Sequence, residues 1–284
     1  MKILVTGGAG YLGSVLVPLL VSAGHEVEVM DIRQPISGNW TNRDIFSCPL
    51  SETDLRNVDA VIHLAALVGD IICHQEPQRT VEVNFLATKY LAHACKKADI
   101  RLIFASSCSV YGVKNELCQE GITEPEPYGV YGITKLAAES DVSNAGGISF
   151  RMATIYGLSP RMRYDLVINE FVRQAKTDKS INIFGGKQMR PFLEIKSAAK
   201  TYLECLKLEK SGGIFNLADE NISLLALGQT VGEIFGCKVN VIPDIIDRRS
   251  YTIDYSRAMK SLSFKPRALR DGIEEMESLD ISAI

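Results

Sequence analysis

The sequence predicts an α/β protein built on a doubly wound parallel sheet, with a smaller C-terminal lobe. Short apolar runs that suit buried strands alternate with longer helical patterns through the first half of the chain. A glycine-rich turn separates the first apolar run from the first helical pattern. Strands that alternate with helices of this length form βαβ units, and these units assemble into a parallel sheet.

The first elements follow from local signals. Residues 2–6 form a short run with β-branched residues that stops at glycines, as a buried strand does before a turn. Residues 11–23 have a helical pattern in which Pro18 is expected to produce a kink. A second strand, residues 27–30, leads to Asp31. Further strands are expected at 60–64, 101–105 and 148–152, and further helices at 79–98 and 131–145.

The domain organisation follows from a change after about residue 155, where the regular alternation of predicted strands and helices ends. Loops rich in Gly, Arg and Pro appear there, with shorter helices between them. We expect a main domain, built on the parallel sheet, over residues 1–156, with 193–218 returning to it. A smaller lobe is expected over residues 157–192 and 219–284.

Composition excludes several classes of function. The 284 residues include 46% hydrophobic and 23% charged residues, and the net charge is −3, so a nucleic-acid partner is not expected. The seven cysteines include no C-x-x-C pair, which indicates reduced thiols in a cytoplasmic protein and neither a disulfide framework nor a metal site. The apolar run 12–23 is interrupted and too short to cross a bilayer, so no membrane association is expected.

The glycine-rich turn has the features of a dinucleotide-binding loop. Gly7, Gly10 and Gly13 let the backbone approach a pyrophosphate, and the following helix offers free N–H groups to the anion. Asp31 lies 18 positions after Gly13, where a carboxylate binds ribose hydroxyls and repels a 2′-phosphate. This favours NAD over NADP, although the nearby Arg33 weakens the preference. The alternative is a simple turn followed by a solvated strand end.

A second pattern predicts a catalytic pair. Tyr131 and Lys135 are four residues apart and share one face of a helix, where the ammonium is expected to lower the pKa of the phenol. Tyr131 can then act as acid and base for a hydroxyl. A hydroxyl-rich stretch, residues 106–109, follows a predicted strand at the edge where open α/β sheets bind ligands. The alternative is an unrelated surface Tyr and Lys.

Taken in order, these motifs resemble the extended short-chain dehydrogenase/reductase family. The resemblance rests on the glycine turn, on His63-Leu-Ala-Ala66, on Ser106-Ser-Cys-Ser-Val-Tyr-Gly112 and on Tyr131-x-x-x-Lys135. It implies a Rossmann-type sheet, NAD as cofactor, and a nucleotide-sugar substrate for an epimerase, dehydratase or reductase.

The resemblance also implies roles for individual residues. Ser107 would bind the reacting hydroxyl, Lys135 would hold the nicotinamide ribose, and Asn84 would steady the region near Lys135. The helices around 84–98 and 131–145 would form a homodimer interface, or else simply pack in the core. The expected cofactor-binding residues are Gly7, Gly10, Tyr11, Leu12, Gly13, Asp31, Ile32, Arg33, Asp44, Ile45, Leu64, Ala65, Ala66, Asn84, Tyr131 and Lys135.

Substrate-binding residues are expected in the second half. Arg190 and Arg249 lie in segments that resemble those where the family places arginines near the nucleotide, and guanidinium groups suit phosphates. The alternative for either arginine is an ordinary surface salt bridge. Arg163, Asn169 and Thr154 are further candidates, and Thr154 stands where many members have Asn.

Some positions depart from the family pattern. Dehydratases that act on C4 and C6 carry Asp-Glu after the catalytic Ser/Thr, whereas this chain has Cys108 and Ser109. Cys108 is therefore a candidate acid or base in another elimination, or a small packing residue. Pro191 replaces the usual Asp, and Glu194 replaces a frequent His, which indicates a remodelled substrate pocket.

Three functions remain open from the sequence. The first is a redox-neutral enzyme with retained NAD, an epimerase ahead of a dehydratase. The second is a keto-sugar reductase that exchanges its cofactor. The third is a non-catalytic NAD-binding protein, since a fold does not fix a function. The sequence does not specify the sugar, its nucleotide or the reacting carbon.

Overall fold

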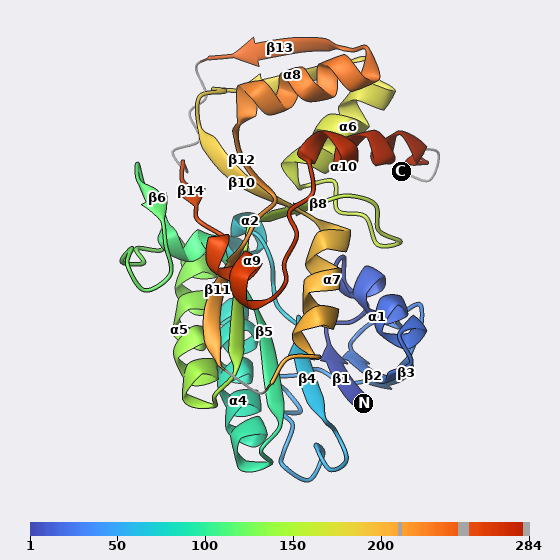
Figure 1. Cartoon of the computed structure of the whole chain (residues 1–284), viewed down its shortest axis with the longest axis vertical. Helices are drawn as coiled ribbons and strands as arrows, with labels where there is room; N and C mark the ends of the chain where they lie inside the picture. The colour runs from blue at the N-terminus through green and yellow to red at the C-terminus, as the bar shows by residue number, and fades with distance from the viewer. Residues whose placement is uncertain (210–211, 244–249, 281–284) are drawn as a thin grey trace.

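The central feature of the computed structural model is a seven-stranded sheet in which all neighbouring strands are parallel (Figure 1). The structure describes residues 1–209, 212–243 and 250–280. The strand order is β11-β7-β5-β4-β1-β2-β3, which confirms the predicted fold class. The strands are β1 (Lys2–Thr6), β2 (Glu26–Asp31), β3 (Asn39–Asn42), β4 (Ala60–His63), β5 (Arg101–Ser107), β7 (Ile148–Met152) and β11 (Gly213–Leu217).

Both faces of this sheet are buried, which explains why its inner strands read as continuous apolar runs. Side chains of β1 and β5 alternate between two hydrophobic cores. Ile3 and Val5 of β1 belong to one core, whereas Leu4 belongs to the other. On β5, Ile103 faces the first core and Phe104 the second.

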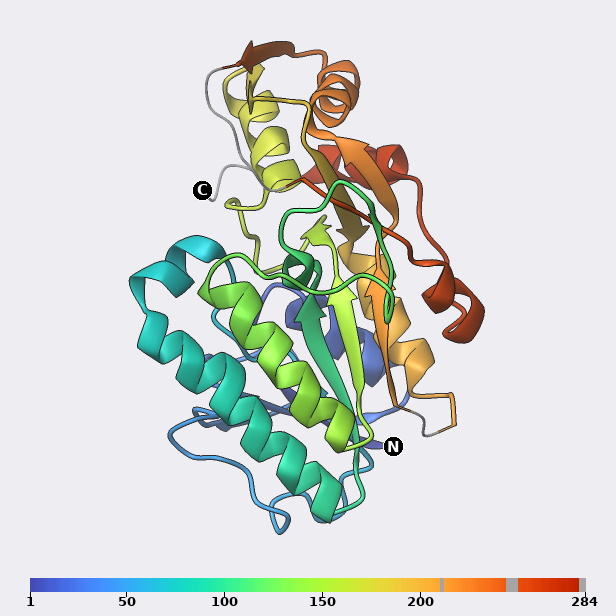
Figure 2. The same cartoon turned by 90° about the vertical axis from the view of Figure 1, so that its left-hand side faces the viewer.

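Helices cover each face of the sheet. On one face, α1 (Gly13–Ser22) packs beside α7 (Ile195–Cys205). On the other face, α4 (Ala87–Lys97) and α5 (Val130–Asn144) lie side by side, as Figure 2 shows. Helix α1 continues through Pro18 as one element and starts two residues later than the sequence pattern predicts.

The predicted helix at 79–98 is divided by a change in hydrogen-bond pattern. It begins as α3 (Pro77–Thr80), continues as a π-helical segment (Val81–Leu86) and becomes α4. Such π segments often occur at functional sites. The predicted cofactor residue Asn84 lies within this segment.

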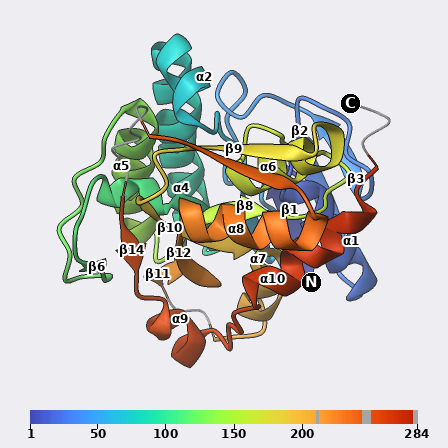
Figure 3. The ribbon, with the colours of Figure 1, turned by 90° about the horizontal axis from the view of Figure 1, so that it is seen from above.

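A smaller lobe stands above the carboxyl ends of the strands and has its own hydrophobic core (Figures 1 and 3). A parallel pair, β9 (Ser180–Phe184) and β13 (Lys238–Ile242), is packed against α6 (Val167–Thr177) and α8 (Leu224–Phe235). A three-stranded sheet, β12-β10-β8, joins the lobe to the main domain. Its strands are β8 (Thr154–Tyr156), β10 (Met189–Glu194) and β12 (Glu220–Ser223), and α10 (Leu269–Glu275) lies nearby.

The remaining elements are short. A second parallel pair joins β6 (Leu117–Cys118) to β14 (Thr252–Ile253). The others are α2 (Asp70–Gln75), α9 (Ser256–Ser261), and 3₁₀ turns at Cys108–Tyr111 and Met276–Ser278. Within the described part of the chain, no helix is long and apolar enough to cross a membrane.

Three further differences from the sequence expectations concern two strands and the assignment of residues to the lobe. Strand β3 was not predicted, since its four residues are polar or aromatic and all exposed at the sheet edge. Strand β5 runs two residues further than expected and ends at Ser107. Residues around 251–264, assigned to the lobe from the sequence, place Tyr251, Ile253 and Phe264 in the core of the main domain. The boundaries between the main domain and the lobe stay a prediction.

Candidate active site

The glycine-rich turn has the geometry that a close backbone approach requires. Gly7 has φ +74°, and a Cβ there would lie 2.5 Å from the backbone nitrogen of Ala65. A Cβ on Gly13 would lie 2.5 Å from the carbonyl oxygen of Gly8. At Gly10 a Cβ would meet only the Gly7 carbonyl oxygen, at 3.2 Å, so this side of the loop is open to an approaching group. The turn thus fits a pyrophosphate at the N-terminus of α1.

Asp31 is fixed at the end of β2. One of its carboxylate oxygens accepts the Ala9 N–H at 2.9 Å, and the other accepts the Arg33 N–H at 2.9 Å. These bonds hold the side chain beside the glycine-rich turn, where a carboxylate can bind ribose hydroxyls. Ile32, the next residue, is exposed.

Asp44 and Ile45 are two of the expected cofactor-binding residues, and Asp44 belongs to a small polar cluster. Asp44 accepts the backbone N–H groups of Phe46 and Ser47, and it forms an ion pair with Arg79. Backbone hydrogen bonds and the Arg79 guanidinium hold its pKa below the usual range, against the effect of burial. Ile45 is buried.

The segment after β4 passes beside the glycine-rich turn. Leu64 and Ala65 pack against the two cores of the main domain and approach Gly7, and Ala66 is half-buried. Asn84 is fully buried and makes two hydrogen bonds to Leu67, accepting its N–H and donating to its carbonyl, each at 2.8 Å. Asn84 therefore fixes the course of this segment directly.

Tyr131, in the first turn of α5, faces Ser107 at the end of β5. Burial raises the pKa of Tyr131 to about 12, while the hydrogen bond with Ser107 and the charge of Arg163 act to lower it. The expectation that Lys135 depresses this pKa was wrong for the chain alone, because the cost of burying a phenolate dominates. Ser107 also hydrogen-bonds Ser109, with 3.1 Å between the two hydroxyl oxygens.

Lys135 lies one helical turn further along α5 and is buried. Its ammonium donates to the Ala105 carbonyl at 2.8 Å and stands 4.7 Å from the centre of the Phe104 ring. Burial lowers the pKa of Lys135 to about 7, against the opposing influence of Cys73 and Glu139.

The geometry of Cys108 favours the packing interpretation. Its side chain is fully buried in the main core, and its thiol lies 3.0 Å from the Arg151 carbonyl oxygen. Burial raises the pKa of the thiol well above its usual value. A thiol that ionises so reluctantly is a poor acid or base near neutral pH.

Tyr11 joins the glycine-rich turn to the lobe. Its hydroxyl donates to the Gly157 carbonyl at 2.6 Å and accepts a hydrogen bond from Asn169 at 2.9 Å. Asn169 also accepts the Gly157 N–H and donates to the Arg163 carbonyl. The Ser159 hydroxyl donates to the Tyr11 carbonyl at 2.8 Å. The polar groups of Asn169 are therefore engaged in holding this junction, although a substrate role was predicted for it.

The other predicted substrate residues within the described chain lie on β8, on β10 and in the loop that follows β8. Arg163 pairs with Asp165 and donates to the Val68 carbonyl at 3.2 Å. Arg190 is buried, with its guanidinium 5.9 Å from the centre of the Tyr251 ring. Thr154 is half-buried on β8, and Arg249 lies outside the described residues.

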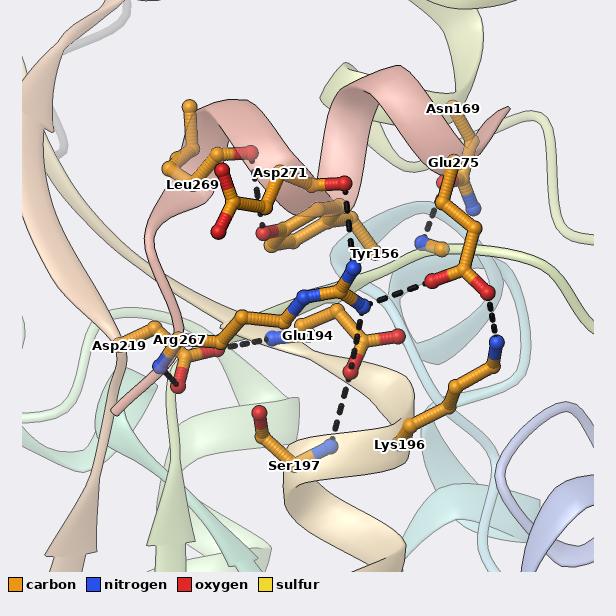
Figure 4. Close-up of polar contacts among 11 residues, drawn as sticks. Tyr156, Asn169, Glu194, Lys196, Ser197, Asp219, Arg267, Leu269, Asp271 and Glu275 are labelled. Atoms are coloured by element: carbon orange, nitrogen blue, oxygen red, sulfur yellow. Dashed lines mark hydrogen bonds and ion pairs between the residues drawn. The ribbon is translucent and has the colours of Figure 1, made fainter. Parts of the chain in front are cut away.

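A buried polar cluster at the junction with the lobe was not predicted (Figure 4). Asp219 accepts the backbone N–H groups of Glu194 and Arg267, at 2.6 and 2.9 Å. Burial raises the pKa of Asp219 to about 6. Glu194 accepts the Ser197 N–H at 2.9 Å and so caps the N-terminus of α7. The Glu194 carboxylate is therefore used to cap α7. This contact does not support the expectation that Glu194 belongs to a remodelled substrate pocket. No local motif signals this cluster, because its members are far apart in the sequence.

Together, the parallel sheet, the glycine-rich turn with Asp31, and Tyr131 beside Ser107 define an NAD-binding enzyme of the extended short-chain dehydrogenase/reductase type. The sequence model of the "NAD dependent epimerase/dehydratase family" matches residues 3–218. The chain belongs to this family, which confirms the resemblance seen in its motifs and NAD as its cofactor.

Individual relatives act on nucleotide-sugars. The chain is 29% identical to UDP-glucuronic acid decarboxylase 1 of Arabidopsis thaliana, over 98% of this chain and 69% of that protein. It is 31% identical to an uncharacterized UDP-glucose epimerase, YtcB, of Bacillus subtilis, over 96% of each chain. Among solved structures, it resembles MoeE5 in complex with UDP-glucuronic acid and NAD, with 30% identity, 96% coverage of each chain and a TM-score of 0.86. It also resembles UDP-glucuronic acid 4-epimerase from Bacillus cereus, with 28% identity, coverage of 99% of this chain and 100% of that one, and a TM-score of 0.85.

Proposed function

We propose that this protein is a redox-neutral epimerase that inverts a sugar carbon, C4 in the first instance, of a UDP-linked sugar or uronate. The observation that carries the proposal is Tyr131 facing Ser107, with Lys135 one turn further along the same helix. The reaction of the B. cereus neighbour and the UDP-sugars bound in the similar structures support the choice of substrate.

Each residue of the proposed site has its own role in the epimerisation. The Ser107 hydroxyl binds the reacting sugar hydroxyl and orients it toward Tyr131, which removes its proton and later returns it. Lys135 would hold the nicotinamide ribose through its ammonium, and Asp31 would bind the adenosine ribose. Bound NAD supplies the hydride acceptor and donor. The nicotinamide cation would favour the tyrosinate and so offset the effect of burial on the pKa of Tyr131.

Epimerisation is favoured over dehydration by the residues that follow Ser107. A dehydration at the neighbouring carbons needs a second acid and base, whereas this position holds a buried thiol, Cys108, and a hydroxyl, Ser109. Removal and return of a hydride at one carbon need only the Tyr131 phenol. The tie between the glycine-rich turn and the lobe through Tyr11 supports cofactor retention and so argues against the reductase alternative.

A second candidate is decarboxylation of a UDP-uronate. Several relatives that match nearly the whole chain are named UDP-glucuronic acid decarboxylases. Oxidation at C4 of a uronate creates a ketone β to the carboxylate, and such acids lose carbon dioxide readily. Arg163, whose charge reaches Tyr131, is suited to bind that carboxylate.

One experiment separates these reactions. Purified protein is incubated with a panel of UDP-, GDP-, CDP- and dTDP-sugars, including UDP-glucuronic acid, without added cofactor, and products are analysed by mass spectrometry and NMR. Unchanged mass with inverted stereochemistry supports the epimerase. Loss of carbon dioxide or of water identifies a decarboxylase or a dehydratase. Conversion only after addition of NADH or NADPH and a keto-sugar would replace the proposal with a reductase.

We also propose that the protein acts in the cytoplasm as a homodimer. Its seven cysteines are free, as a reducing compartment would keep them. Val81, Tyr90 and Ile133, on the helical layer that includes α4 and α5, expose large apolar side chains that a second copy could cover. Light scattering coupled to size-exclusion chromatography tests the dimer, and a monomer at micromolar concentration would contradict it.

A further inference from the structure

Three side chains on one face of α5 contact three consecutive residues of β5. Tyr131 hydrogen-bonds the Ser107 hydroxyl, and Lys135 donates to the Ala105 carbonyl at 2.8 Å. One turn further, Glu139 accepts a hydrogen bond from the Ser106 hydroxyl at 2.5 Å. The proposed catalytic residues are therefore the first two members of a series whose third member, Glu139, has no role in the reaction proposed above.

Glu139 is held by a buried guanidinium from the neighbouring strand. Arg151 on β7 donates through Nη2 to one Glu139 oxygen at 2.7 Å and through Nε to the other at 2.9 Å. The guanidinium also lies 4.8 Å from the centre of the Tyr111 ring. Glu139, Arg151 and Ser106 are each less than 5% exposed. A two-pronged contact of this kind fixes both distance and orientation.

The location of this pair matters more than its contribution to stability. Replacing both members of a buried ion pair by apolar residues is often neutral or stabilising, so such a pair is weak evidence of a stabilising role. Here it joins α5, which carries Tyr131 and Lys135, to β7, and the same carboxylate accepts the Ser106 hydroxyl of β5 beside Ser107. Small displacements of catalytic groups cost large factors in rate.

We infer that Glu139 is a positioning residue: anchored by Arg151, it sets the placement of α5 on β5 and keeps a negative charge one turn from the Lys135 ammonium. The inference rests on the proposed function for the roles of Tyr131 and Lys135. It extends the site by a carboxylate that touches neither substrate nor cofactor.

The charge of Glu139 has a measurable consequence for Lys135. Three titratable groups influence or surround this ammonium: Glu139 from α5, Cys73 from α2 and His63 from β4. Burial lowers the pKa of Lys135, and Glu139 opposes that effect. Removal of the carboxylate should therefore lower this pKa further.

The test begins with Glu139→Gln in the NAD-bound enzyme. Lysines are labelled with ¹³C at Cε, and the signal of Lys135, assigned with a Lys135→Arg variant, is titrated by NMR. We expect the midpoint to fall by about one pH unit or more, and kcat to fall by about tenfold or more. Glu170→Gln, which breaks the Glu170–Arg173 pair on α6, is the matched control and should change neither value.

A double variant covers the case in which Glu139→Gln does not fold, since that change leaves Arg151 buried without its charged partner. Glu139→Leu with Arg151→Met replaces the whole pair by apolar side chains. It should fold with undiminished thermal stability and still lose about tenfold or more in kcat, a combination that a purely structural role does not produce. An unchanged Lys135 midpoint in folded Glu139→Gln, or a wild-type kcat in the double variant, would overturn the inference. If wild-type protein converts no sugar, the proposed function is wrong. The Lys135 titration would still test the inference that Glu139 is a positioning residue.

Discussion

The amide of Asn169 donates a hydrogen bond to the hydroxyl of Tyr11 across 158 residues of sequence, at 2.9 Å. One partner belongs to the glycine-rich turn, and the other belongs to helix α6 of the lobe. Because the same hydroxyl donates to the Gly157 carbonyl, one phenol joins both parts of the molecule beside the proposed cofactor site.

This junction should control how long NAD stays bound. Tyr11→Phe keeps the ring but removes the hydroxyl that donates to the Gly157 carbonyl and accepts one hydrogen bond from the Asn169 amide. The loss of these buried hydrogen bonds costs about 1–3 kcal/mol. If bound NAD depends on the closed junction, its dissociation should become about tenfold faster or more. Stopped-flow fluorescence of NADH release measures the rate, with the exposed Tyr90→Phe as control. Equal release rates in wild type and Tyr11→Phe would show that the junction has no part in retention.

The phenol of Tyr131 should be essential for turnover and dispensable for cofactor binding. Tyr131→Phe removes the only atom of this side chain that can exchange a proton, so kcat should fall by about 10²-fold or more. NADH affinity, measured by fluorescence titration, should remain near that of wild type. Tyr128→Phe, an exposed phenol three residues away, provides the comparison. Turnover at the wild-type rate by Tyr131→Phe would refute the mechanism.

The Cys108 thiol should be unnecessary for the chemistry. Cys108→Ala removes it and leaves a small cavity in the main core, so the free energy of unfolding should decrease by about 1 kcal/mol. Because the thiol points to the Arg151 carbonyl and ionises reluctantly, kcat should stay close to wild type. Urea denaturation and steady-state kinetics measure the two effects. A large loss of kcat with little loss of stability would restore Cys108 as an acid or base.

The parts of the site that the sequence could predict are those set by local spacing. Gly7, Gly10 and Gly13 require a particular backbone, and Tyr131 and Lys135 share a helix face whatever packs against it. The parts that could not be predicted depend on contacts between distant segments. Strand pairing places Arg151 beside Ser106, and the packing of α5 on the sheet brings Glu139 to Arg151. Burial raises the pKa of Tyr131. The comparisons with known proteins then confirm the family and its cofactor, which the order of the motifs had indicated.

The buried His63 should make folding sensitive to acid. Its ring lies between the hydroxyls of Thr6 and Thr88, at 2.6 and 2.9 Å, and burial with the nearby Lys135 charge lowers its pKa to about 3. The unfolded chain binds a proton near pH 6.5, so between these two values the unfolded state holds more protons and stability falls as the pH falls. At pH 5 this histidine alone should reduce the free energy of unfolding by about 2 kcal/mol relative to pH 8.

Urea denaturation at pH 5 and pH 8 checks this expectation. His63→Gln cannot take up the proton, so the difference between the two pH values should shrink by about the same 2 kcal/mol, even if the variant is less stable at both. His93→Gln, at an exposed position on α4, serves as the control and should keep the wild-type difference. An undiminished pH dependence in His63→Gln would mean that other groups cause the acid sensitivity and that His63 accepts its proton without loss of the fold.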